Sequence, residues 1–155
     1  MFAPILERVR SSRPLIHSIT NYVTVNDCAN MLLACGASPI MADDREEAEE
    51  ITALCSGLTI NIGTLTSRTI PSMLAAGRRA NELNHPVVLD PVGAGASSLR
   101  TETALKLLEE DGLVETTQRK RPTVAHGAVA GHKNVLETLQ RADACAVDDI
   151  LKTGI

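Results

Sequence analysis

The chain has 155 residues, a formal net charge of −4 and 44% hydrophobic residues, which is typical of one soluble globular domain. The acidic balance offers no surface for nucleic acid, and the two aromatic side chains, Phe2 and Tyr22, provide no platform for base stacking. No apolar run approaches the roughly 20 residues of a membrane helix, and charged residues follow Met1 too closely for a signal peptide. We therefore expect a cytoplasmic domain, residues 1–155, with no nucleic-acid or membrane partner.

Up to residue 110, short apolar runs alternate with helical segments. Gly36 stands where a helix would end, and Pro71 suits a first helical turn. This alternation predicts βαβ units, and hence a doubly wound α/β fold with a mostly parallel sheet and helices on both faces. The expected strands are 14–16, 38–41, 58–62 and 86–89, and the expected helices are 22–34, 45–55, 69–83 and 101–110.

The pattern weakens after residue 110. Residues 111–121 read as a polar loop that ends in three consecutive cations, and the following segment has little hydrophobic period. A strand at 123–125 is only weakly indicated. We expect residues 111–155 to form a divergent and poorly specified tail.

Polar and small residues stand where the expected strands end. Asn21 follows the first strand, Met41 closes the second, Asn61 and Gly63 close the third, and Asp90 closes the fourth. Because the carboxyl ends of parallel strands meet at one edge of a sheet, these residues predict a shared ligand pocket there. The alternative is ordinary turn chemistry, since Asn, Gly and Asp are favoured in turns.

The stretch DPVGAGASS contains the best single candidate, Asp90. Pro91 favours an extended Asp90, and the glycines at 93 and 95 permit positive φ and close approach of a phosphate to bare backbone N–H groups. An acid beside such a turn suits a Mg²⁺ that is held partly through water and nucleotide phosphates. The motif is neither GxGxxG nor GxxxxGK[ST], so it predicts neither a standard dinucleotide site nor a P-loop.

Three stretches, RPLIHSITNYVTVNDCANMLLACGASPIMA, NIGTL and PVVLDPVGAGASSLRTETALKLL, resemble hydroxyethylthiazole kinases, which are ribokinase-like enzymes of thiamine salvage. The resemblance covers about residues 8–110 and implies the N-terminal portion of that fold. It implies ATP-dependent phosphorylation of the hydroxyl of 4-methyl-5-(2-hydroxyethyl)thiazole, with Mg²⁺ as cofactor and ATP as co-substrate. It also implies a homotrimer with active sites between subunits.

The same resemblance assigns roles to individual residues. Met41, which position alone favours as a core filler, matches the methionine that contacts the thiazole. Asn21 and Gly63 resemble parts of the same substrate pocket, and Asp90 matches the acid near the metal and phosphates. His126 aligns with an arginine that contacts ATP.

The tail departs from the family pattern. Around His126 only Gly127 of the Arg-Gly-Asn-x-x-Glu motif is kept, and the C-terminal anion hole with its catalytic base has no counterpart. We therefore expect a truncated chain with impaired activity and assign no catalytic residue. The alternatives are a non-catalytic thiazole-binding or subunit-interface fragment, and a kinase for another small alcohol on the same fold.

Overall fold

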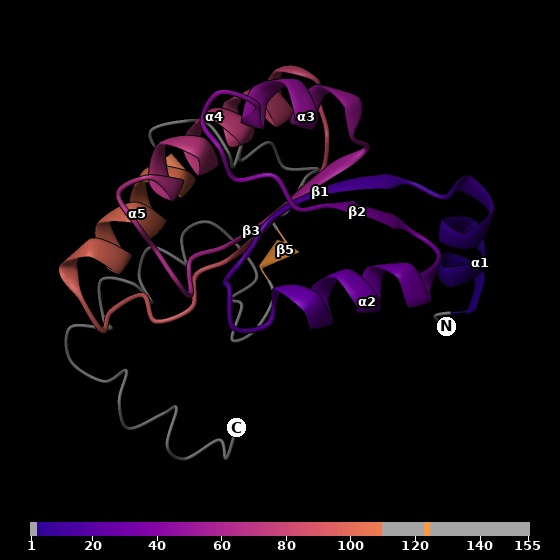
Figure 1. Cartoon of the computed structure of the whole chain (residues 1–155), viewed down its shortest axis with the longest axis horizontal. Coiled ribbons are helices and arrows are strands. Elements are labelled where there is room, and N and C mark those ends of the chain that lie inside the picture. Colours follow the sequence, from indigo (N-terminus) through magenta and orange to yellow (C-terminus); the bar gives the residue numbers. More distant parts are fainter. Residues whose placement is uncertain (1–2, 110–122, 125–155) are drawn as a thin grey trace, which may run out of the picture.

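A computed structural model describes residues 3–109 and 123–124, which form a parallel sheet with the strand order β2-β1-β3-β4-β5 (Figure 1). The strands are β1 (Leu15–Ile19), β2 (Ser38–Ile40), β3 (Gly57–Asn61), β4 (Val87–Asp90) and β5 (Thr123–Val124). The helices are α1 (Ala3–Ser12), α2 (Val25–Cys35), α3 (Ala48–Leu54), α4 (Thr69–Glu82) and α5 (Ser98–Glu109).

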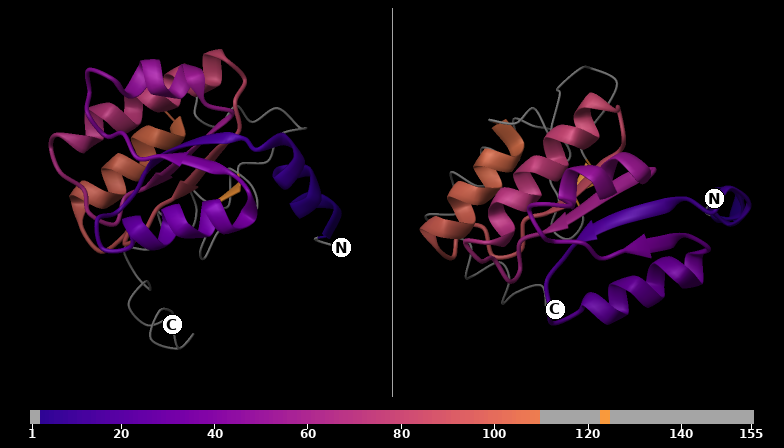
Figure 2. Two further views of the ribbon diagram at one scale, coloured as in Figure 1. Left: turned by 45° about the vertical axis from the view of Figure 1, so that its right-hand side comes forward. Right: turned by 45° about the horizontal axis from the view of Figure 1, so that its top comes forward.

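Helices cover both faces of the sheet. The views agree that α2 lies on one face and that α3, α4 and α5 lie on the other, with α1 at the end of the sheet (Figure 2). β1 pairs with both β2 and β3, so the chain changes its direction of winding at β1. The predicted doubly wound α/β fold is confirmed, and the crevice between the carboxyl ends of β1 and β3 is its topological switch point.

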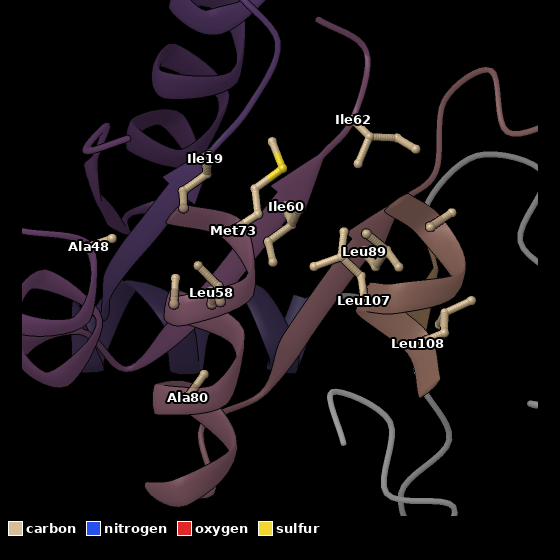
Figure 3. Packing of buried hydrophobic residues seen from close by; sticks show 12 residues of the cluster. Ile19, Ala48, Leu58, Ile60, Ile62, Met73, Ala80, Leu89, Leu107 and Leu108 are labelled. Atoms are coloured by element: carbon tan, nitrogen blue, oxygen red, sulfur yellow. The ribbon is translucent and has the colours of Figure 1, made fainter. Parts of the chain in front are cut away.

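The core lies between the sheet and the helices α4 and α5. Leu58 and Ile60 from β3 pack in one buried cluster with Met73 of α4 and Leu107 of α5 (Figure 3). Full burial of each such side chain stabilises the fold by about 1.5–3 kcal/mol. The core fixes β3 and β4 in place, and with them the strand ends that carry the candidate site.

Several helix boundaries follow the expected local chemistry. α2 ends at Cys35 and is followed by Gly36, whose φ of 94° is left-handed, and Pro71 lies in the first turn of α4. The expected start at residue 45 is too early, because α3 begins at Ala48. The Asp44 side chain accepts a hydrogen bond from the Glu46 N–H at 2.9 Å, and this local bond competes with helical geometry.

The sequence pattern missed α1 and the full length of β1. α1 has no buried residue, and its apolar residues, Ile5, Leu6 and Val9, are too few to distinguish a short helix from an irregular segment. β1 continues to Ile19 through two polar residues, His17 and Ser18, which are both buried. Ser18 is satisfied by a 2.7 Å hydrogen bond with the hydroxyl of Thr59 on β3.

His17 joins three elements from within the sheet. Its Nε2 lies 2.7 Å from the Ala42 carbonyl oxygen, and its Nδ1 lies 2.8 Å from the Thr52 hydroxyl on α3. Burial lowers the pKa of His17, although the bond to Ala42 acts in the opposite direction. The Ala42 carbonyl can only accept, so the neutral ring carries its proton on Nε2 and donates it to Ala42. The Thr52 hydroxyl has one proton for two acceptors, the His17 Nδ1 and the Ala48 carbonyl at 2.7 Å.

The weakly indicated strand near residue 123 is present as β5, which pairs with β4. Other expectations for residues 110–155 lie outside the described residues. Among the helices described, none combines the length and apolar character needed to cross a bilayer.

Candidate functional site

A chain of side-chain hydrogen bonds crosses the carboxyl ends of β1, β3 and β4. The Asn21 Nδ2 donates to Asn61 Oδ1 at 3.1 Å, and the Asn61 Nδ2 donates to Asp90 Oδ2 at 2.8 Å. Asn61 and Asp90 are direct partners in the register of β3 and β4. The bond between Asn21 and Asn61 spans the switch point, so three of the predicted strand ends meet in one network.

Asn21 also shapes the loop that leaves β1. Its Oδ1 accepts hydrogen bonds from the N–H groups of Val23 and Thr24, at 3.1 and 3.0 Å, and from the Thr24 hydroxyl at 3.1 Å. This pattern is a side-chain turn that directs the chain into α2. The Oδ1 of Asn21 is thus engaged within the protein, so the side chain positions the loop as well as bordering the site.

Gly63 fits between the two asparagines. Its N–H donates to Asn61 Oδ1 at 2.8 Å. A Cβ atom at this position would lie 2.8 Å from Asn61 Oδ1, which is closer than real Cβ atoms approach, and 3.0 Å from the Asn21 Cβ, which is a tight contact. The close packing of Asn21 against Asn61 therefore depends on a glycine at residue 63.

The turn after β4 has the predicted backbone. Gly93 and Gly95 have φ values of 73° and 91°, which favour glycine. The expectation of bare N–H groups is wrong for three amides. The N–H groups of Ala94 and Ala96 bond to carbonyls within the turn, and that of Gly95 donates to the Thr101 hydroxyl at 2.9 Å.

Apolar side chains border the same edge of the sheet. Met41 directly follows β2 and is 36% exposed, so the core-filler interpretation is wrong. Val23, after β1, and Val92, after β4, are also exposed. An apolar rim beside a few fixed polar groups is the usual composition of a small-molecule site.

A second polar cluster joins the loops after β1, β2 and β3. The Arg68 guanidinium donates to both carboxylate oxygens of Asp43, at 3.0 and 3.1 Å, and to the Tyr22 hydroxyl at 2.8 Å. The Tyr22 hydroxyl in turn donates to Asp43. This bond to Asp43 raises the pKa of Tyr22. Partial burial raises the pKa of Asp43, but the hydrogen bonds from Arg68 and Tyr22 lower it further, to a net value below the ordinary one.

The donor set at Asp90 is compatible with a hard cation that keeps most of its own water. Among residues 3–109, no three His, Cys, Asp or Glu side chains gather closely enough to enclose a metal ion. Mg²⁺ does not require such a cage, since it usually binds one or two carboxylates together with water and substrate phosphates. Asp90, fixed by Asn61, fits that mode.

Comparison with known proteins shows the family of the chain. The model of the hydroxyethylthiazole kinase family matches residues 6–116. The chain belongs to the hydroxyethylthiazole kinase family. The match spans nearly all of the described residues, and it bears out the family that the sequence motifs indicated.

Individual relatives are close in sequence. A hydroxyethylthiazole kinase of Clostridium acetobutylicum is 74% identical over 105 residues, which cover 68% of this chain and 38% of that protein. One of Desulfovibrio desulfuricans is 54% identical over 149 residues, covering 96% of this chain and 51% of that protein. The latter alignment therefore runs through most of the segment expected to diverge.

The solved structure of a hydroxyethylthiazole kinase from Pyrococcus horikoshii OT3 matches with a TM-score of 0.67 and 53% identity. The match covers 70% of this chain and 42% of the solved one. The chain thus spans between two fifths and about half of the length of these relatives.

The structure brings together four of the five predicted site positions. Asn21, Gly63 and Asp90 belong to one network, and Met41 lies at the same edge of the sheet. The fifth, His126, lies outside the described residues. Sequence reasoning missed the cluster of Tyr22, Asp43 and Arg68, and it missed Arg100, because such contacts join residues far apart in the chain.

Proposed function

We propose that this chain contributes the alcohol-binding and metal-binding side of an ATP-dependent kinase for 4-methyl-5-(2-hydroxyethyl)thiazole. The observation that carries the proposal is the hydrogen-bonded chain Asn21–Asn61–Asp90 at the carboxyl edge of the sheet, where the exposed Met41 follows the neighbouring strand β2. Family membership supports the same reaction class.

Each side of the site has a separate task in this proposal. Met41 forms an apolar wall for the thiazole ring, and Asn21 and Gly63 form the polar floor where the alcohol lies. Both donate to Asn61 Oδ1, and these two hydrogen bonds hold the floor in place, so the substrate hydroxyl is oriented at little further entropic cost.

Asp90 would hold Mg²⁺ through an oxygen or a bound water, and a bound Mg²⁺ would neutralise charge on the transferring phosphoryl group. Asn61 fixes the carboxylate of Asp90 by the 2.8 Å bond to its Oδ2. The positive-φ turn at residues 93–95 permits a phosphate to approach the backbone. No general base is assigned within residues 3–109.

The proposal includes a homotrimer and a cytoplasmic location, where ATP is available. The exposed apolar side chains on and before α2, Val23 and Met31, offer a surface for a neighbouring subunit. Such a subunit would complete an active site that lies between chains.

A second candidate is binding of the thiazole alcohol without phosphoryl transfer. The observation that favours it is a difference between the alcohol side and the phosphate side of the described site. Asn21 and Gly63 are held as a polar floor for the alcohol, whereas the N–H groups of Ala94, Gly95 and Ala96 on the phosphate side already bond within the chain. His126, the proposed ATP contact, lies outside the described part. This candidate predicts that the alcohol binds with equal affinity in the presence and absence of Mg²⁺ and ATP.

Transfer of labelled γ-phosphate from ATP to the thiazole alcohol tests the proposal. We expect Mg²⁺-dependent product from the wild-type chain and a loss of at least about a hundredfold in Asp90→Asn, by analogy with removal of one electrostatic contact. Asp44→Asn, an exposed acid near the same edge, is the matched control and should retain the rate. Alcohol binding with no product above background would support the second candidate instead.

A further inference from the structure

Arg100 connects the two loops that flank Asp90. From the first turn of α5, its Nη1 donates to the Ile62 carbonyl at 2.6 Å and its Nη2 donates to the Gly63 carbonyl at 2.7 Å. The same Nη1 donates to the Val92 carbonyl at 3.0 Å. One guanidinium thus bonds to the loop after β3 and to the loop after β4.

The path of the side chain depends on a glycine. A Cβ atom at Gly93 would lie 3.1 Å from the Arg100 Cδ and 3.4 Å from its Nε. The positive φ of Gly93 also favours glycine. The turn after β4 therefore leaves room for the arginine as well as shaping the approach to Asp90.

All three carbonyl acceptors belong to the main chain. Three hydrogen bonds from one planar fork fix the relative position of two loops more strictly than a single donor can. Gly63 is held on both sides, because its N–H bonds to Asn61 and its carbonyl to Arg100. The network thus runs continuously from Asn21 through Gly63 and Arg100 to the turn at residue 92.

We propose that Arg100 is a positioning residue that sets the separation between the alcohol side of the site, at Gly63, and the phosphate side, at residues 92–95. The inference rests on the proposed function for the meaning of these two sides. The structural part of the proposal is that the Arg100 side chain couples the motions of the two loops. This coupling can be measured without any ligand.

Hydrogen exchange of backbone amides provides the first measurement. In Arg100→Ala we expect exchange to rise about tenfold or more in both loops, residues 62–64 and 92–96, while β1 and α4 remain protected. Arg79→Ala is the matched control, since it removes an arginine that pairs with Glu82 on the solvent side of α4. A rise in only one loop, or an equal rise across the whole sheet, would overturn the proposal.

Arg100→Lys separates positioning from general stability, and it remains available if Arg100→Ala does not fold. Lysine keeps the charge and the long aliphatic chain but lacks the planar guanidinium with its several N–H donors. Its ammonium group can therefore hydrogen-bond to one loop at a time. We expect it to restore the melting temperature without restoring joint protection of the two loops. Full restoration of both quantities would show that any long cation suffices and would contradict the proposal.

Calorimetric binding of the thiazole alcohol is the second measurement. We expect a dissociation constant about tenfold higher in Arg100→Lys than in the wild type, because a displaced Gly63 disturbs the alcohol floor. Unchanged affinity in a folded Arg100→Lys would overturn the positioning role. If the wild-type chain binds no alcohol, the proposed function fails, and the exchange experiment still decides whether Arg100 couples the loops.

Discussion

Asn61 and Asp90 lie side by side at the ends of β3 and β4, and the Asn61 amide donates to the Asp90 carboxylate at 2.8 Å. The Oδ1 of Asn61 accepts hydrogen bonds from the Asn21 Nδ2 and from the Gly63 N–H. Asn61 is therefore the centre of the candidate site. Its register opposite Asp90 places an oriented carboxylate beside the topological switch point of the sheet.

Removal of the Asn61 side chain should destabilise the fold. Asn61→Ala leaves three partly buried polar groups without this partner, so we expect the free energy of unfolding to fall by about 1–3 kcal/mol. Urea denaturation measures the change. Asn26→Ala, on an exposed position of α2, is the control and should stay within about 0.5 kcal/mol of the wild type. Equal stability of the two variants would show that the network contributes nothing.

Gly63→Ala should disturb the packing of the two asparagines. The added methyl group would lie 2.8 Å from Asn61 Oδ1, so the loop must shift and alcohol binding should weaken at least about tenfold. Gly57→Ala, at the other end of β3, is the matched control, since its nearest neighbour would be 3.4 Å away. Calorimetry on both variants makes the comparison. Equal binding by both would contradict the proposed alcohol floor.

His17 should make stability depend on pH. Burial lowers its pKa in the folded chain below the ordinary value of 6.5, so the unfolded chain binds more protons in the window just below 6.5. The free energy of unfolding should therefore rise with pH through that window and reach its full His17 contribution above it. Urea denaturation between pH 5 and about 7.5 measures the slope.

The matched variant is His17→Gln, which can hydrogen-bond but does not titrate, and it should flatten this part of the slope. Nitrogen NMR of the wild type should also find the ring proton on Nε2, where it donates to Ala42. A variant with the wild-type slope, or a protonated ring near neutral pH, would exclude the neutral buried imidazole.

Tyr22 gives a direct optical test of the cluster at the loop ends. It is the single tyrosine of the chain, and there is no tryptophan, so near-ultraviolet titration reports this phenol alone. The wild-type pKa should lie above the ordinary 10.0, chiefly because the hydroxyl donates to Asp43. Asp43→Asn should bring it back towards 10.0, whereas Asp44→Asn should not. An unshifted wild-type titration would mean that the cluster does not form in solution.

The sequence pattern was sufficient to predict the parallel sheet, because the local backbone preferences of the residues agree with the fold. Apolar runs alternate with helical segments, and Asp90-Pro91 and Gly93 end β4 and turn the chain as their backbone preferences require. α1 was missed because it is only ten residues long and has few apolar residues, so its helical period is too short to recognise.

The contacts within the site could be anticipated only in part. Parallel pairing implies that Asn61 and Asp90 share an edge, but not that their side chains bond to each other. Arg100 bonds to carbonyls 37 and 38 residues earlier in the chain, and no spacing rule covers such contacts. The three satisfied N–H groups after β4 are bonded locally, since those of Ala94 and Ala96 reach carbonyls three residues earlier and that of Gly95 reaches the Thr101 hydroxyl. The glycines predict the positive φ of this turn but do not identify the acceptors of its N–H groups.

The central claim is that the carboxyl edge of β1–β4 binds the thiazole alcohol, and residue-specific NMR during its titration tests this most directly. The account predicts shift changes concentrated at Asn21, Met41 and residues 61–63, with affinity weakened about tenfold in Met41→Ala but nearly kept in Met41→Leu. Shift changes on the helical face of α4 and α5 instead, or no saturable change at any residue, would contradict the account.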